Sequence, residues 1–165
     1  MDTLEPPMPM AITIAPERPD QDDLDRLFDR HSAFCHADTP PESIHMMDRA
    51  ALAAEGIEFH VMRQDGLAIG MGAIKRIGAH EGEIKSMHVL NDERGRGLGR
   101  RMVDHLIAAA RAQGMTRLSL ETGAQDSFAP ARMLYAAAGF VPCEPFGDYR
   151  PDPMSVFMTL PLAQA

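Results

Sequence analysis

The stretch Asn91–Arg101 reads N-D-E-R-G-R-G-L-G-R-R, with three glycines within five positions and four arginines within eight. A strand-like run, Glu83–Leu90, precedes it, and an amphipathic helical pattern follows it to about Ala112. Glycine allows the backbone to approach a ligand closely. A helix that begins at such a turn presents unpaired N–H groups and the positive end of its dipole. We therefore interpret the stretch as a grip on the phosphates of a cofactor.

Three glycine-rich phosphate motifs compete for this stretch, and their spacing separates them. A dinucleotide fingerprint, G-x-G-x-x-G, counted from Gly95 would need glycine where Arg100 stands. A P-loop needs G-K-[ST], whereas Gly99 is followed by two arginines. What remains is R-x-x-G-x-G, Arg94–Gly99, between a strand and a helix.

The length and composition indicate one domain. The chain has 165 residues and 45% hydrophobic content, enough for a substantial core. Residues 1–9 contain three prolines and are expected to be a flexible lead-in to a single domain over residues 10–165. No run approaches eighteen apolar residues, and the N-terminus has no secretion signal, so we expect no membrane partner and a cytoplasmic location.

The charge and the cysteine and histidine content exclude several classes of function. A net charge of −8 argues against nucleic acid as a partner, because such binding depends on neutralising phosphates with Lys and Arg. Two cysteines are too few for a disulfide framework. Seven histidines occur without H-E-x-x-H or C-x-x-C spacing, so we expect no metal.

The apolar pattern predicts an α/β (α+β) fold with a mixed, mostly antiparallel central sheet flanked by helices. The expected order is strand, two helices, three antiparallel strands, helix, strand, helix and two strands. Asp65-Gly66 is a strong hairpin signal, and Gly70 and Gly72 predict a bulge or a close backbone approach. Ser127 is expected to cap the last helix. The predicted segments are strands Met10–Ala15, Ile57–Arg63, Leu67–Arg76, Glu83–Leu90, Met115–Glu121, Phe140–Val141 and Met154–Leu160, with the first two helices from Pro19 to about Phe34 and over about His45–Ala54.

Three segments together resemble the GNAT N-acetyltransferases. Arg94–Gly99 with its flanks resembles their acetyl-coenzyme A motif, the strand ending M-H-V resembles their fourth strand, and A-x-x-L-Y-x-x-x-G-F at Ala131–Phe140 resembles their C-terminal signature. The resemblance runs from about Ile57 to Phe140, and the element order fits the GNAT fold over nearly the whole chain. It implies acetyl-coenzyme A as the cofactor and N-acetyl transfer as the activity.

The resemblance also implies a set of cofactor-binding residues. The backbone from Arg96 to Arg100 would hold the pyrophosphate, and the splayed strand at Met87–Val89 would pair with the pantetheine arm. Many members carry Asn where Phe128 stands, so that contact is open, although Ser127 could supply it. The full expected set is Met87, His88, Val89, Arg94, Gly95, Arg96, Gly97, Leu98, Gly99, Arg100, Ser127, Phe128 and Tyr135.

Transfer of acetyl to an amine requires a base for the ammonium and a proton for the departing thiolate. Glu83 matches by offset the catalytic glutamate of the histone-acetylating branch, and His88 and Glu121 are further candidates for the base. On a period of two, His88 faces away from Met87 and Val89. Tyr135 matches the family tyrosine that donates a proton to the leaving thiolate.

The acceptor is expected to be the primary amine of a small molecule, such as an amino acid or a related amine. The loops Thr39–His45 and Pro145–Tyr149 lie where the family varies with substrate, and the expected substrate residues are Glu42, Ser43, Glu121, Asp148 and Tyr149. A peptide or protein N-acetyltransferase, and a non-catalytic acyl-coenzyme A-binding regulatory module, are the alternatives. A homodimer is possible.

Overall fold

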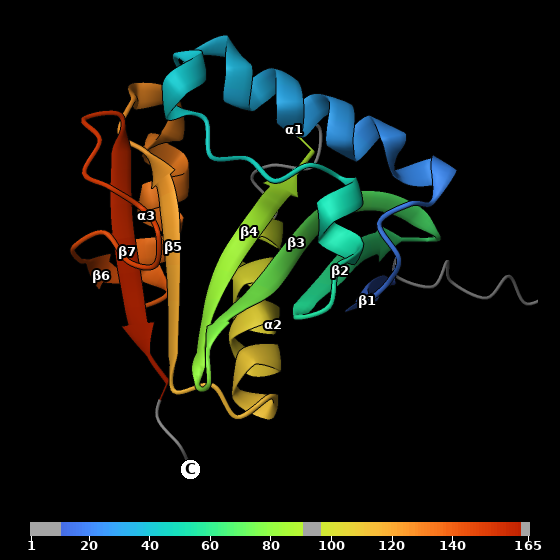
Figure 1. Cartoon of the computed structure of the whole chain (residues 1–165). Coiled ribbons are helices and arrows are strands. Elements are labelled where there is room, and N and C mark those ends of the chain that lie inside the picture. The colour runs from blue at the N-terminus through green and yellow to red at the C-terminus, as the bar shows by residue number, and fades with distance from the viewer. Residues whose placement is uncertain (1–10, 91–96, 163–165) are drawn as a thin grey trace, which may run out of the picture.

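The computed structural model describes residues 11–90 and 97–162, and one seven-stranded sheet runs through them in the order β1-β2-β3-β4-β5-β7-β6 (Figure 1). Neighbouring strands are antiparallel except β4 and β5, which are parallel. The strands are β1 Ile12–Pro16, β2 Ile57–Gln64, β3 Leu67–Gly78, β4 Glu81–Val89, β5 Arg117–Gly123, β6 Val141–Pro142 and β7 Ser155–Pro161. The mixed, mostly antiparallel sheet is therefore confirmed.

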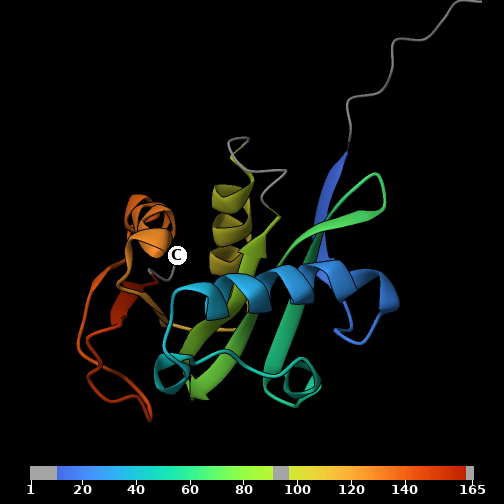
Figure 2. The same cartoon turned by 90° about the horizontal axis from the view of Figure 1, so that it is seen from above.

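The helices cover both faces of the sheet. Helix α1 (Asp25–Ala37) crosses one face, and α2 (Leu98–Ala112) and α3 (Ala129–Ala137) lie on the other (Figures 1 and 2). Each face has its own apolar core, one centred on α2 and one under α1. Short 3-10 turns complete the chain: η1 Asp22–Leu24, η2 Pro41–Ser43, η3 Ala50–Ala53 and η5 Asp126–Phe128. No helix of residues 11–90 and 97–162 is long and apolar enough to cross a membrane.

The predicted hairpin turn and the predicted close approach of the backbone at a glycine are both present. Asp65 and Gly66 have φ values of 50° and 85°, the positive pair that a tight two-residue hairpin requires. A Cβ at Gly72 would lie 2.9 Å from Leu106 Cδ1, because α2 packs directly against the backbone of β3 at that point. The predicted close approach at Gly72 is thus confirmed.

A bulge in β4 controls which side chains face each side of the sheet. Ser86 has a φ of 54°, and the register with β3 moves from Met71–His88 to Ala73–Lys85, so that Ser86 and Met87 share one position opposite Gly72. Before the bulge, Glu83 and Lys85 point to the face that carries α1; after it, Met87 packs against the core around α2.

The predicted helix over His45–Ala54 is wrong. Only the 3-10 turn Ala50–Ala53 forms there, and residues 44–48 are irregular. The His45 carbonyl accepts a hydrogen bond from Lys85 Nζ at 3.1 Å, and Ile44 and Met46 line a cavity. These tertiary contacts outweigh the weak helical periodicity of the segment.

Candidate active site

A gap between β4 and β5 forms the base of the site. The two parallel strands pair only from Glu81 to Ile84 on β4 and from Arg117 to Leu120 on β5, and then they diverge. Beyond Ile84, the edge of β4 that would face β5 borders a cavity instead. The expectation that the strand is splayed at Met87–Val89 is met by this geometry.

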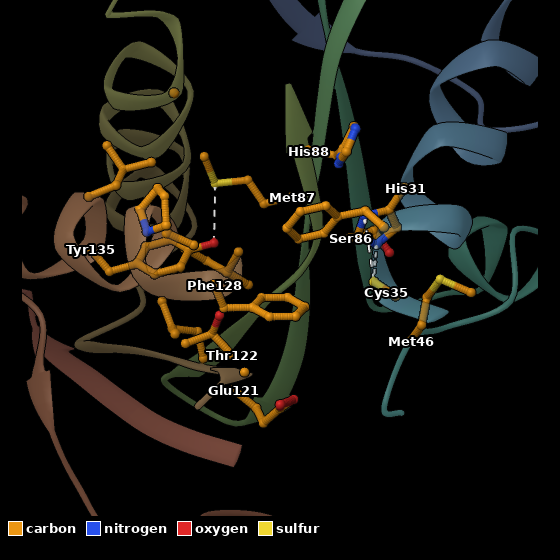
Figure 3. Close-up of a pocket in the computed structure, with 18 of the residues that line it drawn as sticks. His31, Cys35, Met46, Ser86, Met87, His88, Glu121, Thr122, Phe128 and Tyr135 are labelled. Atoms are coloured by element: carbon orange, nitrogen blue, oxygen red, sulfur yellow. Dashed lines mark hydrogen bonds between the residues drawn. The ribbon is translucent and has the colours of Figure 1, made fainter. Parts of the chain in front are cut away.

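The cavity has a volume of about 430 Å³ and passes through the gap from one face of the sheet to the other. Figure 3 shows Tyr135, Met87 and Phe128 on one side and His31, Cys35 and Met46 on the other, with Glu121 at the base. We call the first side, bordered by α2 and α3, the cofactor end, and the second, bordered by α1 and the 39–46 loop, the acceptor end. Residues from α1, the 39–46 loop, β4, α2, β5, η5 and α3, together with Met154, therefore meet in one space.

The N-terminus of α2 opens into the cofactor end. Gly97, Leu98, Gly99 and Arg100 line the cavity, and Gly97 has a φ of 73° with open space where a Cβ would be. No side chain caps the helix in the described part of the chain, and its first turn carries no acidic residue. The backbone N–H groups of the first turn of a helix have no partner within the helix, and together with the positive end of the helix dipole they suit a diphosphate. The predicted contributions of Arg94, Gly95 and Arg96 lie outside the described residues.

Tyr135 lies at the inner part of the cofactor end. Its side chain is 7% exposed, and its hydroxyl donates to Met87 Sδ at 3.6 Å (Figure 3). Burial, with the nearby Glu121 charge, raises the pKa of Tyr135 above its ordinary range. The phenol is therefore a neutral O–H donor whose partner in this structure is already a sulfur atom.

Glu121, at the end of β5, is the carboxylate that the geometry places in the cavity. Burial raises its pKa to about 7, against the opposing charge of Lys85. The Glu121 charge also acts on Tyr135 on one side and on Cys35 on the other, so the carboxylate lies between the two ends of the cavity. A carboxylate with this pKa can accept a proton near neutral pH.

Glu83, the first sequence candidate for the base, has a different environment. It is 3% exposed, accepts a hydrogen bond from the Tyr149 hydroxyl at 2.6 Å and lies 3.4 Å from Lys85 Nζ. Lys85 Nζ also donates to the Tyr149 oxygen at 2.8 Å. Lys85 lines the cavity, whereas Glu83 and Tyr149 are not among the lining residues, so these two side chains lie behind its wall.

His88, on β4, packs against a part of α1 that carries His31 and Cys35, two residues that the sequence did not single out. The His88 ring lies 5.2 Å from the His31 ring and 6.3 Å from Phe34, on the face away from Met87, as expected from the strand period. Cys35 Sγ lies 3.9–4.0 Å from the ring nitrogens of His31. Burial raises the pKa of Cys35 to about 11 and lowers that of His31 to about 4, so they form a neutral pair.

Phe128, which stands where many GNAT members carry Asn, is part of an aromatic wall. Its ring lies 4.9 Å from that of Phe34, joining the end of α1 to the start of α3. Ser127 borders the cavity, but its hydroxyl donates to Asp38 Oδ2 at 3.0 Å, and neither η5 nor α3 has a side-chain cap. The prediction that Ser127 caps the last helix is wrong, because the hydroxyl reaches α1's end instead.

The remaining predicted substrate residues divide between the cavity and the surface. Ser43 is 8% exposed and lines the acceptor end, whereas Glu42 and Asp148 are exposed and do not. The described residues contain no group of three or more His, Cys, Asp or Glu side chains that could hold a metal ion.

This fold and site define a class of acyl-transferring enzyme, and comparisons with known proteins identify the family. The profile of the acetyltransferase (GNAT) family matches residues 21–140. The chain is 44% identical over 121 residues to YsnE, an uncharacterised N-acetyltransferase of Bacillus subtilis, covering 73% of this chain and 80% of that one. It is 40% identical over 153 residues to an IAA acetyltransferase of Azospirillum brasilense, covering 92% and 98%.

A solved structure gives the same fold. The yncA protein of Salmonella typhimurium, whose structure contains its cofactor acetyl-CoA, is 22% identical with a TM-score of 0.67, covering 94% of this chain and 96% of that one. The chain belongs to the GNAT acetyltransferase family, and it is an N-acetyltransferase by class.

Proposed function

We propose that the protein transfers acetyl directly from acetyl-coenzyme A to the primary amine of a small molecule. The observation that carries this proposal is the continuous cavity from the N-terminus of α2 to Glu121, with Tyr135 between them. When bound, acetyl-coenzyme A supplies an acetyl group activated as a thioester. The N–H groups at residues 97–100 would hold its diphosphate, and the edge of β4 at Met87–Val89 would pair with its pantetheine arm.

Glu121 is the base in this proposal. An alkyl ammonium has a pKa of about 10.4, so a proton must be removed before its nitrogen can form the C–N bond. The Glu121 carboxylate receives that proton, directly or through water, and releases it to solvent. Its pKa of about 7 keeps it largely ionised at pH 8 and still basic enough to serve. Glu83 supports this role less well, because its carboxylate is bonded to Tyr149 and lies behind the wall.

Tyr135 provides the proton for the sulfur as the C–S bond breaks, and the phenolate that remains takes up a proton from water before the next cycle. Its raised pKa keeps the hydroxyl protonated at any working pH, and its weak bond to Met87 Sδ is readily exchanged for a stronger one to a thiolate. His88 borders the cavity but packs against α1 on the acceptor side, which favours a role in the wall.

Direct transfer is favoured over a covalent acetyl-enzyme by the state of Cys35. A thiol with a pKa of about 11 is protonated near neutral pH, and a His31 with a pKa of about 4 is a poor base for activating it. The Cys35–His31 pair therefore lacks the thiolate that nucleophilic catalysis needs.

The activity is tested by incubating the protein with acetyl-coenzyme A and a panel of amines, peptide N-termini among them, while free thiol is measured. Thiol release that depends on a small amine, with the acetylated product seen by mass spectrometry, supports the proposal. Turnover only with peptides would replace the small molecule with a peptide acceptor. Tight binding of acetyl-coenzyme A in calorimetry without turnover on any amine would instead indicate a regulatory binding module.

A further inference from the structure

The wall of the acceptor end has an apolar part, which lies beside polar residues such as Thr39, Ser43 and His45. Phe34 from α1 meets Phe128, which borders the cofactor end, edge to face at 4.9 Å, and Ile44 and Met46 from the loop after η2 and Met154 before β7 add further apolar surface. Contact with such walls stabilises an apolar ligand in proportion to the area removed from water. The body of the acceptor, beyond its amine, is therefore expected to be apolar.

The Lys85 ammonium group, which lies at this end, already has a partner for each of its N–H donors. Lys85 Nζ donates to the His45 carbonyl at 3.1 Å and to the Tyr149 oxygen at 2.8 Å, and it lies 3.4 Å from Glu83 Oε2. These three partners account for the three N–H donors of an ammonium. Its charge is balanced by Glu83, and its geometry holds two loops together. Lys85 thus stabilises the wall of the cavity and does not offer a binding site for a carboxylate of the substrate.

The other candidates for a cation at the described lining, His31, His45 and Arg100, are also poorly placed to hold a substrate carboxylate. Burial lowers the pKa of His31 to about 4, so it is neutral. His45 Nε2 has no hydrogen-bond partner among the described residues, but it lies 3.9 Å from Asp152 Oδ2, so a substrate carboxylate that reached it would also meet the Asp152 carboxylate. Arg100, at the cofactor end, bonds to Asp104 and to the Ala137 carbonyl.

The remaining charge at the acceptor end is negative. The charges of Glu83 and Asp152 both act on Glu121, and only Lys85 opposes them. An incoming ammonium is attracted to these carboxylates, whereas a second carboxylate beside the amine is repelled by Glu121 at close range.

We propose that the acceptor is a primary amine on an apolar body that carries no carboxylate next to the amine, so that free amino acids are excluded by charge. This inference rests on the proposed acetyltransferase function and narrows its substrate class. Specificity then arises both from apolar contact and from repulsion of the wrong substrate.

Two matched series separate the effect of charge from that of shape. One consists of phenethylamine, phenylalaninamide and phenylalanine, and the other of 3-(methylthio)propylamine, methioninamide and methionine. The amide and the acid in each series have nearly the same shape and differ in charge. Values of kcat/KM are measured by thiol release and expressed per concentration of unprotonated amine, which removes differences in amine pKa.

We expect the amine and the amide of at least one series to be acetylated, with the free acid at least about 30-fold lower in kcat/KM. Met46→Arg places a cation on the wall and should reduce that ratio at least about 5-fold. Met133→Arg is the matched control, since Met133 is 72% exposed on α3 and outside the lining, and it should leave the ratio unchanged.

Different failures have different meanings. Equal or faster turnover of the free acids would overturn the substrate class and leave the acetyltransferase activity intact. The same holds if none of the six compounds reacts while another amine of the wider panel does. If no amine or peptide reacts, both the substrate class and the proposed function fall.

Discussion

Replacing Glu121 with Gln should lower activity and raise stability, a combination that few core substitutions produce. The change keeps the shape of the side chain and removes its charge and basicity. Loss of a general base lowers the rate by about 10²–10⁴-fold. In the unaltered enzyme, kcat/KM should rise with pH through an apparent pKa of about 7, because only the ionised carboxylate accepts a proton. That limb should disappear in the variant.

The stability effect follows from the same pKa. Burial raises the pKa of Glu121 from 4.5 to about 7, so the folded state prefers the neutral carboxyl. The stability from the neutral form is fully present below pH 4.5 and is lost as the pH rises through 7. At about 1.4 kcal/mol per pH unit, the ionised group costs up to about 3 kcal/mol at pH 8. Glu121→Gln avoids this cost, so its melting temperature at pH 8 should rise by up to roughly 10 °C, with little change at pH 4.

The assay combines pH–rate profiles with thermal unfolding at pH 4 and pH 8. Glu42→Gln is the matched control, since Glu42 is exposed and outside the cavity lining, and it should change neither property. A variant that keeps a wild-type pH limb would refute the base role and return it to Glu83 or His88. A loss of stability in the variant at pH 8 would refute the argument that burial makes the ionised form of Glu121 destabilising.

Four other substitutions test the rest of the site. Tyr135→Phe should lower kcat by about 10–100-fold with little change in acetyl-coenzyme A affinity by calorimetry; equal losses in kcat and affinity would contradict a proton-donor role. Gly97→Glu, which places a negative charge on a residue with a φ of 73°, should abolish cofactor binding, and unchanged affinity would disprove the phosphate cradle. Tyr149→Phe removes the hydroxyl shared by Glu83 and Lys85. It should lower the free energy of unfolding, measured with denaturant, by about 1–3 kcal/mol and raise the KM for the amine. Unaltered values would show that these hydrogen bonds are not needed to hold the wall. Cys35→Ala should keep most of its activity, and its inactivation would revive a covalent route.

Much of the fold could be predicted because its signals are local. The alternation of apolar residues set the strands, and Asp65-Gly66 set a hairpin through two positive φ values that adjacent residues supply. The helix after the glycine-rich stretch begins at Leu98, where the motif places it. The segment around His45 was mispredicted because its conformation depends on Lys85, forty residues away.

The site could be predicted only in part. Tyr135, Glu121, Ser43 and the start of α2 were expected near the substrates, and all of them border the cavity. Glu83 and Tyr149 were expected there separately, but they bond to each other across 66 positions of the chain. His31 and Cys35 gave no signal, since a histidine and a cysteine one helical turn apart are equally compatible with an ordinary helix face.

The sequence by itself determined the family and predicted the phosphate-binding turn and the proton donor, because each depends on residue types at fixed spacing in one segment. The tertiary structure decided which carboxylate enters the cavity. The bulge at Ser86 shifts the alternation of β4, and the divergence of β4 from β5 exposes Glu121 while Glu83 stays behind the wall. Burial and distant charges then set the pKa of Glu121, and neither is visible in a single segment of the chain.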